Sequence, residues 1–246
     1  EARQLIPAAE PLACVNAATY ALGSLAPDSL VAAFGKRLAT ETKAAGQWTA
    51  SLAETTVSVT DAQGEKRNAY ILFVSPTQVN FVIPTGTASG MALIEITSAD
   101  GYVTSVTRNI AAVAPGLFSV DATGNGWASG VVLRVFADQS QKYEPLVQYD
   151  SLTQQFVSLP ITINNPDEKV FLVLFGTGWR WRSEIAAISL RAGGVNLPVQ
   201  YCGIGPLLGL DQMNIELPAS LAGRGNLVLE VTIDGQTANP LRFNVK

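Results

Sequence analysis

The sequence predicts an all-β chain folded as two immunoglobulin-like β-sandwiches in tandem. Two observations lead to this prediction. Short apolar and β-branched runs recur about every 8 to 12 residues with turn residues between them, as in small β-sandwiches. One stretch of sequence also occurs twice, because residues 78–84 read QVNFVIP and residues 212–218 read QMNIELP. The likeness continues from 90–101 to 225–235, so we infer a duplicated β-unit.

The first copy is expected to span residues 1–113. The alternating β-branched run at 56–60 predicts a half-buried strand, and Asp100-Gly101 predicts a tight hairpin. Residues 36–53 are polar and rich in alanine, and they predict a loop. The other expected segments are a lead-in at 1–26 with an edge strand near Cys14, and strands at 29–34, 69–74 (returning beside 56–60), 78–83, 91–97 and 102–111.

A β-rich connector is expected at residues 114–163, and the second copy at 164–246. The connector has no counterpart in the first copy, and two alternatives stay open: it packs between the sandwiches or it lengthens a sheet of the second one. Its apolar run at 131–136 predicts that it holds the two sandwiches at a fixed angle. Asp234-Gly235 predicts a second closing hairpin. The expected strands are 130–137, 146–149 and 156–163 in the connector, then 170–175, 185–191, 197–202, 212–217, 225–232 and 236–245.

The composition excludes several classes of function. The net charge is −4 and no cluster of Lys and Arg is present, so we expect neither nucleic acid nor an anionic membrane surface as a partner. No apolar run approaches the length that crosses a bilayer, so we expect no membrane insertion. The absence of histidine excludes Ser-His-Asp and Cys-His catalysis and removes the commonest zinc ligand. We therefore expect no metal and no cofactor.

The chain begins at Glu1, without an initiating Met or the apolar segment of a signal peptide. We expect a processed or trimmed chain whose upstream signal is missing from this sequence.

Two cysteines, Cys14 and Cys202, leave two alternatives open. Their spacing is not that of a metal site. In an oxidising compartment they would form one disulfide bridge from the N-terminal segment to the second copy. Otherwise they are two buried, unpaired thiols.

The segment Trp179-Arg180-Trp181-Arg182 is the strongest candidate for a ligand site. If it is extended, its two indole rings share one face, where they would stack on sugar rings while Arg180 and Arg182 bond hydroxyl groups. The alternative is that one or both rings pack against the connector or the other sandwich. Exposed and coplanar rings would favour the sugar site.

Other polar residues favour structural roles. Asn80 and Asn214 recur in both copies, which predicts that their amides bond the backbone of a neighbouring loop. Glu95 and Glu230 have the chemistry of a glycosidase carboxylate pair, but they lie in different copies among apolar neighbours, so we expect them to face solvent. Residues 121–126 lack most ligands of a calcium loop and predict a turn.

A set of motifs in a fixed order resembles a known family. The motifs are residues 15–20 (VNAATY), 26–30 (APDSL), 114–118 (APGLF), 174–178 (LFGTG), 209–214 (GLDQMN), 221–225 (LAGRG) and 234–239 (DGQTAN). Together they are similar to the uncharacterised Solibacter-type C-terminal domain, a tandem β-module at the ends of large secreted bacterial proteins. Phe-Gly followed by a small loop also resembles the IPT/TIG branch of immunoglobulin-like folds. The resemblance covers nearly the whole chain from Cys14 onward. It implies export, a place on or outside the cell, and no catalytic residues.

Two positions depart from the pattern of this family. Cys202 stands where the family has a small residue before glycine, and Trp179-Arg180-Trp181 is bulkier than the family's loop. Because both cysteines are unusual, the resemblance favours a Cys14–Cys202 bridge.

The favoured function is a non-catalytic extracellular module that serves as spacer, attachment or protein-interaction domain of a secreted or surface protein. Its expected partners are a surface protein or a polysaccharide. The alternative is a carbohydrate-binding module that uses Trp179 and Trp181. A third function, an enzyme, would require a cleft that gathers two acidic groups with shifted pKa values, and we do not expect one.

Overall fold

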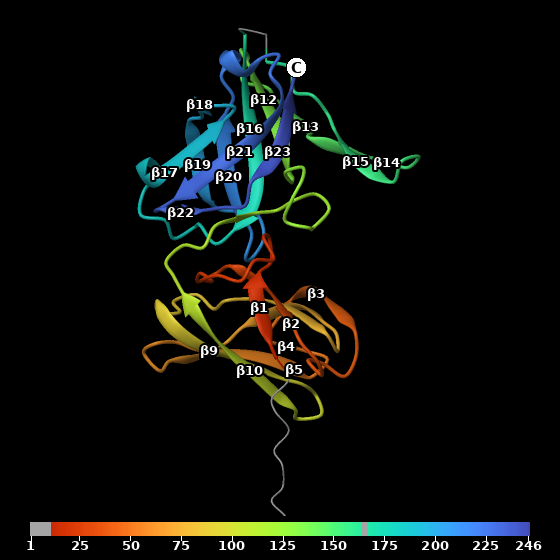
Figure 1. Cartoon of the computed structure of the whole chain (residues 1–246), viewed down its shortest axis with the longest axis vertical. Coiled ribbons are helices and arrows are strands. Elements are labelled where there is room, and N and C mark those ends of the chain that lie inside the picture. Colours follow the sequence, from red (N-terminus) through yellow and green to blue (C-terminus); the bar gives the residue numbers. More distant parts are fainter. Residues whose placement is uncertain (1–10, 164–166) are drawn as a thin grey trace, which may run out of the picture.

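The computed structural model describes residues 11–163 and 167–246, so residues 1–10 of the expected lead-in and residues 164–166 lie outside the described part. Within these ranges the chain consists of antiparallel β-sheets with two short 3-10 turns, which confirms the all-β prediction. Figure 1 shows β1–β10 as one body and β11–β23 as a second body above it. In each body a core of buried apolar side chains packs between two sheets, so we call them the N-terminal sandwich and the C-terminal sandwich.

Among the described residues, no helix has the length and apolar character needed to cross a bilayer.

The N-terminal sandwich packs a five-stranded sheet against a second sheet. The first sheet has the order β1 (Ala13–Asn16), β2 (Leu30–Phe34), β8 (Gln78–Val82), β7 (Tyr70–Val74) and β3 (Lys43–Thr49). The second has the order β10 (Val103–Ile110), β9 (Gly90–Thr97), β5 (Thr55–Thr60) and β4 (Ser51–Leu52), with β6 (Lys66–Asn68) on β5. Alternation along β5 places Val57 and Val59 in the core, as the sequence predicts.

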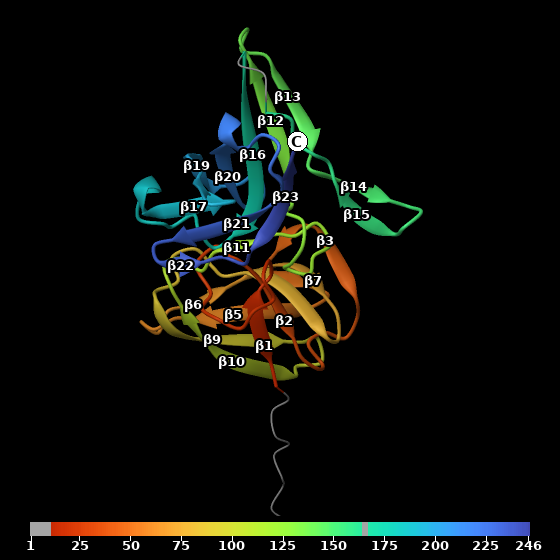
Figure 2. The same ribbon diagram turned by 45° about the horizontal axis from the view of Figure 1, so that its top comes forward.

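The C-terminal sandwich repeats this plan with additions. Its first sheet has the order β13 (Gln141–Pro145), β12 (Gly130–Phe136), β16 (Glu168–Thr177), β20 (Asp211–Glu216) and β19 (Val199–Ile204), with β11 (Gly116–Leu117) on β16. The second has the order β18 (Val195–Asn196), β17 (Ile188–Ala192), β21 (Gly225–Ile233) and β22 (Gln236–Thr237), with β23 (Leu241–Val245) also on β21. The 3-10 turns are Ile185–Ala187 and Ala219–Leu221. A hairpin of β14 (Val147–Asp150) and β15 (Gln155–Ser158) projects from the side of this sandwich (Figures 1 and 2).

The two repeated sequence segments pair in the same register. Asn80 lies opposite Ala32, and Asn214 lies opposite Val173. Each asparagine accepts a hydrogen bond from the glutamine two residues earlier on its own strand, at 2.9 Å in the N-terminal sandwich and 2.8 Å in the C-terminal one. The expected partner, the backbone of a neighbouring loop, is therefore wrong for these bonds. The recurring side chains instead form an amide pair on one face of the strand.

The adjacent strands carry an irregularity at the same place in both sandwiches. The register of β7 shifts between Ile71 and Phe73, and that of β19 shifts between Val199 and Tyr201. A β-bulge adds one unpaired residue and bends the strand. The likeness between the two halves thus extends to a local defect that the sequence did not reveal.

Several expected elements are corrected by the structure. Residues 36–53, expected as a loop, contain β3 and β4. Residues 70–74 do not return beside β5. The short β6 does so, and the chain then crosses at buried Ala69 to β7 in the opposite sheet.

The expected connector at 114–163 lengthens a sheet of the C-terminal sandwich, which is one of the two places expected for it. β12 pairs along its whole length with β16, and β13 pairs with β12. Val132, Leu146 and Ile161 lie in the core of the C-terminal sandwich. Its apolar character therefore reflects burial within one sandwich.

The cysteines lie in different cores and are both free thiols. Cys14 is buried in the N-terminal core and Cys202 in the C-terminal core, so the structure contains the second alternative, two buried and unpaired thiols, and not the Cys14–Cys202 bridge that the resemblance favours. Burial raises the pKa of each thiol to about 12. These thiols are protonated at neutral pH and inert as nucleophiles.

Candidate functional site at the junction of the two sandwiches

The segment of residues 179–182 lies at the junction, but it is not a flat sugar platform. Gly178 adopts φ of 85° directly after β16, and Arg182 N donates to Trp179 O at 3.1 Å, so the segment is a turn. The same-face relation of an extended strand therefore does not hold. Trp179 is fully buried, whereas 52% of Trp181 is exposed. The expected pair of exposed, coplanar rings is wrong.

Trp179 is a core residue held against a glycine. A side chain at Gly176 would overlap the six-membered part of its indole ring, so only glycine lets this ring close the end of β16. The indole nitrogen of Trp179 is buried without a hydrogen-bond partner in the described chain. The ring therefore acts through packing alone.

Asp211 organises the turn through a buried carboxylate. Its Oδ2 accepts hydrogen bonds from Trp179 N at 2.8 Å and Arg180 N at 3.2 Å, and its Oδ1 accepts one from Arg180 Nε at 2.7 Å. Arg180 also donates to Leu210 O at 3.0 Å, and only 8% of its side chain is exposed. Burial raises the pKa of Asp211 above its ordinary value, because the opposing amides and guanidinium only partly compensate. Arg180 is thus committed to an internal ion pair and is not free to bind a sugar.

Asp211 lies in no pattern that predicts a functional role from the sequence. The usable signal was its place at the start of the repeated segment, where the first copy has Thr77. An acidic residue that replaces a neutral one before a buried strand requires a cationic partner.

Trp181 joins the two sandwiches. Its indole Nε1 donates to Asp28 Oδ2 at 2.8 Å, and Asp28 belongs to the segment before β2. Asp28 is itself buried and fixed, because Thr85 Oγ1 donates to its Oδ1 at 2.5 Å. Arg182 is half-buried, and within the described residues its Nε has no hydrogen-bond partner. Trp181, one of the two tryptophans expected to bind sugar, therefore makes a structural contact between the sandwiches.

Thr177 is a second bridge, and it is fully buried. Its hydroxyl donates to Gly209 O at 2.7 Å and accepts a hydrogen bond from Leu30 N at 2.8 Å. Gly209 has φ of 75°, and a side chain there would lie 2.7 Å from Leu30 and 2.8 Å from Val82. The loop before β20 thus seats directly on the N-terminal sandwich.

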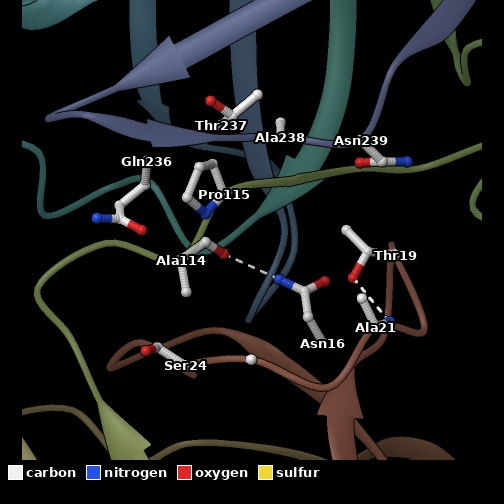
Figure 3. A pocket seen from close by; sticks show the side chains of 11 residues that line it. Asn16, Thr19, Ala21, Ser24, Ala114, Pro115, Gln236, Thr237, Ala238 and Asn239 are labelled. Carbon is white, nitrogen blue, oxygen red and sulfur yellow. Dashed lines mark hydrogen bonds between the residues drawn. The ribbon is translucent and has the colours of Figure 1, made fainter.

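A polar groove of about 340 Å³ also lies between the sandwiches (Figure 3). Asn16 projects across it and donates to Ala114 O at 2.9 Å, while its oxygen accepts from Ala18 N. Asn239 is likewise engaged, with Leu117 N, Leu117 O and Gly124 O. Because these two asparagine amides are used internally, the groove is part of the joint.

A different hollow at the junction is almost wholly apolar. Its volume is about 410 Å³, and its lining includes Leu30, Trp48, Leu72, Leu207 and Leu210. Trp48 and Leu72 come from strands β3 and β7 of the N-terminal sandwich, whereas Leu207 and Leu210 belong to the loop before β20 that contains Gly209. The same loop therefore both closes the joint and forms a wall of this hollow.

The other candidate residues are not brought together. Glu95 pairs with Lys66 at 2.8 Å on the N-terminal sandwich, and Glu230 lies opposite Arg191 on the C-terminal one. Residues 121–126 form a turn in which Asp121 accepts bonds from nearby hydroxyls. In the part of the chain that the structure describes, no group of three His, Cys, Asp or Glu side chains could hold a metal.

No protein-family model matches the chain, and no curated protein matches it. Among solved structures, the chain is similar to SGBP-B of the Bacteroides ovatus mixed-linkage glucan utilization locus, in complex with a mixed-linkage heptasaccharide. The TM-score is 0.34 and the sequence identity is 12%, over 90% of this chain and 43% of that chain. The chain thus spans less than half the length of that protein, and so low a TM-score does not establish a shared fold.

Proposed function

We propose that the chain is a non-catalytic extracellular module in which two immunoglobulin-like, IPT/TIG-like sandwiches are held at a fixed angle. It would serve as spacer, attachment or protein-interaction domain at the surface of a cell or in a secreted protein. The proposal joins the sequence resemblance, which implies export, to the geometry of the junction.

The observation that carries the proposal is the buried hydroxyl of Thr177. It bonds the backbone of Leu30 in one sandwich and of Gly209 in the other at once, without exposure to water. Buried hydrogen bonds of this kind fix a geometry, because an unpaired buried group costs about 1–3 kcal/mol. A flexible linker would place no such bond between the domains.

The neighbouring contacts support the same conclusion. The Trp181–Asp28 and Asn16–Ala114 bonds cross the junction at other points. Ala114 N also donates to Gly178 O at 2.8 Å. Hydrogen bonds that cross the junction at several separate places resist both bending and twisting of one sandwich against the other.

The fixed angle can be tested by distance measurement between spin labels. Ser105→Cys in β10 and Ser220→Cys near the second 3-10 turn are exposed positions, one in each sandwich. The native thiols are buried, so they remain unlabelled. We expect a narrow distance distribution in the otherwise native chain.

The matched variant is Thr177→Val, which keeps the side-chain volume and removes both bonds. We expect the distance distribution to broaden while each sandwich stays folded. A broad distribution before this change would contradict a fixed spacer. A distribution that Thr177→Val leaves unchanged would show that the hydroxyl does not set the angle.

A further inference from the structure

A shallow hollow opens where the projecting hairpin β14–β15 meets the loop before β12. Its volume is about 400 Å³, within the usual range of small-molecule sites. Its lining includes Val120, Asp121, Trp127, Gln154, Gln155 and Phe156. The hairpin stands away from the sandwich in both views (Figures 1 and 2), and the hollow shares no lining residue with the groove of Figure 3.

The polar side chains of this hollow keep their bonding capacity. Gln154 and Gln155 are exposed, and their amides make no hydrogen bond to any part of the chain that the structure describes. Within the same described ranges, the indole nitrogen of Trp127 has no hydrogen-bond partner either. In this respect the hollow differs from the groove of Figure 3, whose asparagine amides are used internally.

Asp121 contributes a fixed carboxylate with one free oxygen. Ser119 Oγ and Thr123 Oγ1 each donate to its Oδ1 at 2.8 Å, and Thr123 N donates to the same oxygen at 3.2 Å. All three bonds fall on Oδ1, which leaves Oδ2 as an acceptor for a ligand. Partial burial would raise the pKa of Asp121, but these donors lower it below its ordinary value, so the carboxylate is ionised at neutral pH.

The aromatic side chains sit on anchored backbone. Trp127 O accepts a hydrogen bond from Val120 N at 3.1 Å, and the residue bridges to Arg242 of β23. Phe156 is braced within the hairpin by Tyr149, with ring centroids 5.3 Å apart at 65°. Both Trp127 and Phe156 are only partly buried.

We propose that this hollow binds a neutral glycan, with a pyranose ring against Trp127 and Phe156 and its hydroxyls bonded to Gln154, Gln155 and Asp121. A pyranose ring has apolar C–H faces and a rim of hydroxyls that both donate and accept. Aromatic surfaces match the faces, amides match both kinds of bond, and a carboxylate accepts from a hydroxyl.

The lining disfavours other ligand classes. Among the described residues, no Lys or Arg lines the hollow, so an anionic ligand would meet an uncompensated carboxylate. A proline-rich peptide would use the aromatic rings, but its carbonyl groups cannot donate to Asp121 Oδ2. The free acceptor therefore points to a ligand rich in hydroxyl donors.

The test is electrophoresis in native gels that contain hydroxyethylcellulose, xylan, galactomannan or laminarin. We expect at least one of these polysaccharides to retard the native chain. The variants Trp127→Ala and Gln154→Ala/Gln155→Ala should each weaken the affinity about tenfold or more. Tyr143→Ala is the matched control, because this residue is 62% exposed on β13, outside the hollow, and should bind like the native chain.

The double glutamine variant distinguishes loss of binding from loss of folding. Both side chains are exposed, so their removal should leave the midpoint of thermal unfolding unchanged. Absence of retardation in all four gels would overturn the proposal. So would retardation that persists undiminished in the folded double variant. Binding of a decaproline peptide at this hollow in place of glycan would also overturn it, in favour of a peptide site.

Discussion

The loop after β2 and the loop after β16 follow the same path in different surroundings. In each, Phe-Gly at the end of the strand is followed by a residue with positive φ and then by a buried apolar side chain. The corresponding residues are Phe34, Gly35, Arg37 (φ 56°) and Leu38 in the first loop, and Phe175, Gly176, Gly178 (φ 85°) and Trp179 in the second. The difference between them shows how a loop that closes a sandwich can also become a joint.

In the first loop the contacts are internal. Leu38 packs beside Gly35, and its backbone N–H donates to Pro76 O at 3.0 Å. Arg37 forms an ion pair with Asp100 whose side chains are 61% and 42% exposed. In water such a pair contributes little to stability.

In the second loop the equivalent positions face the N-terminal sandwich. Gly178 lies where any side chain would overlap the carbonyl oxygen of Ala114. The arginine of this loop, Arg180, is paired with a fully buried Asp211. The loop after β16, which joins the sandwiches, therefore differs from the loop after β2 in two local features: a glycine at the position with positive φ and a buried ion pair.

The largest expected effect concerns the two ion pairs. Asp211→Ala should destabilise the chain by about 3–5 kcal/mol, because it leaves the Arg180 guanidinium buried without a counter-charge. It also removes the acceptor of two backbone N–H groups. Urea unfolding followed by circular dichroism measures the change in the free energy of unfolding.

Asp100→Ala is the control and should have a smaller effect: it removes the bonds from Ser98 and Tyr102 in the hairpin turn, but Arg37 stays hydrated. Equal losses for the two substitutions would show that burial does not separate the two pairs.

A second prediction concerns the buried side chains that end the two loops, Trp179 and Leu38. Trp179→Leu gives the second loop the side chain of the first, and should cost about 2–3 kcal/mol, because the smaller residue leaves a cavity beside Gly176. Leu38→Met keeps the volume of the buried side chain in the first loop, and it should lower the free energy of unfolding by less than about 1.5 kcal/mol. The midpoint of thermal unfolding gives the ranking. A Trp179→Leu chain as stable as the native one would mean that the ring is not needed to close the sandwich.

The third prediction compares the two loop residues that have positive φ, Gly178 and Arg37. Gly178→Ala should cost about 1–3 kcal/mol, because it adds backbone strain and displaces Ala114. Arg37→Ala should change stability much less, since this position already holds a non-glycine residue at positive φ. Urea unfolding of both variants measures the difference, and equal costs would contradict a special requirement for glycine at the joint.

Local pattern was enough to predict most strands and the hairpin between β9 and β10. The alternation of β5 and the Asp-Gly turn after β9 predict a strand and a hairpin that the structure contains. The repeat placed Gln78–Val82 and Asp211–Glu216 as matching strands, and they pair with equivalent neighbours. Periodicity and turn chemistry are local, so these features are readable from sequence.

The elements that depend on distant contacts were not readable. β3 has the sequence KAAGQWT, which has low β-propensity, and it is a strand because it pairs with β7. Nothing local shows that the chain changes sheets at Ala69. The roles of Trp179 and Trp181 depend on a turn at Gly178 and on Asp28, which is far away in the sequence. A two-residue spacing indicates one face only when the segment is extended.

The smallest expected effect concerns the turns that follow β5 and β17. The first turn is built around Asp61, whose carboxylate accepts bonds from Ala88 N, Gln63 N, Glu65 N and Arg67 Nη1. The second turn has Gly193-Gly194 at the equivalent place and no acid. The donors, with the Ala88 amide first, lower the pKa of Asp61 from 3.8 to about 2 in the folded chain.

A folded pKa below the unfolded one means that the ionised carboxylate stabilises the fold above about pH 4, and that this contribution is lost as the pH falls toward 2. We therefore expect Asp61→Asn to be less stable than the native chain at pH 6, with the difference shrinking between pH 4 and pH 2. Glu41→Gln removes the same charge at an exposed site and is the control for net charge. Urea unfolding at half-unit pH steps distinguishes the two variants. A difference between Asp61→Asn and the native chain that stays constant down to pH 2 would show that these hydrogen bonds do not depend on the ionised carboxylate, and that the first turn is held as the glycine turn is, by its backbone alone.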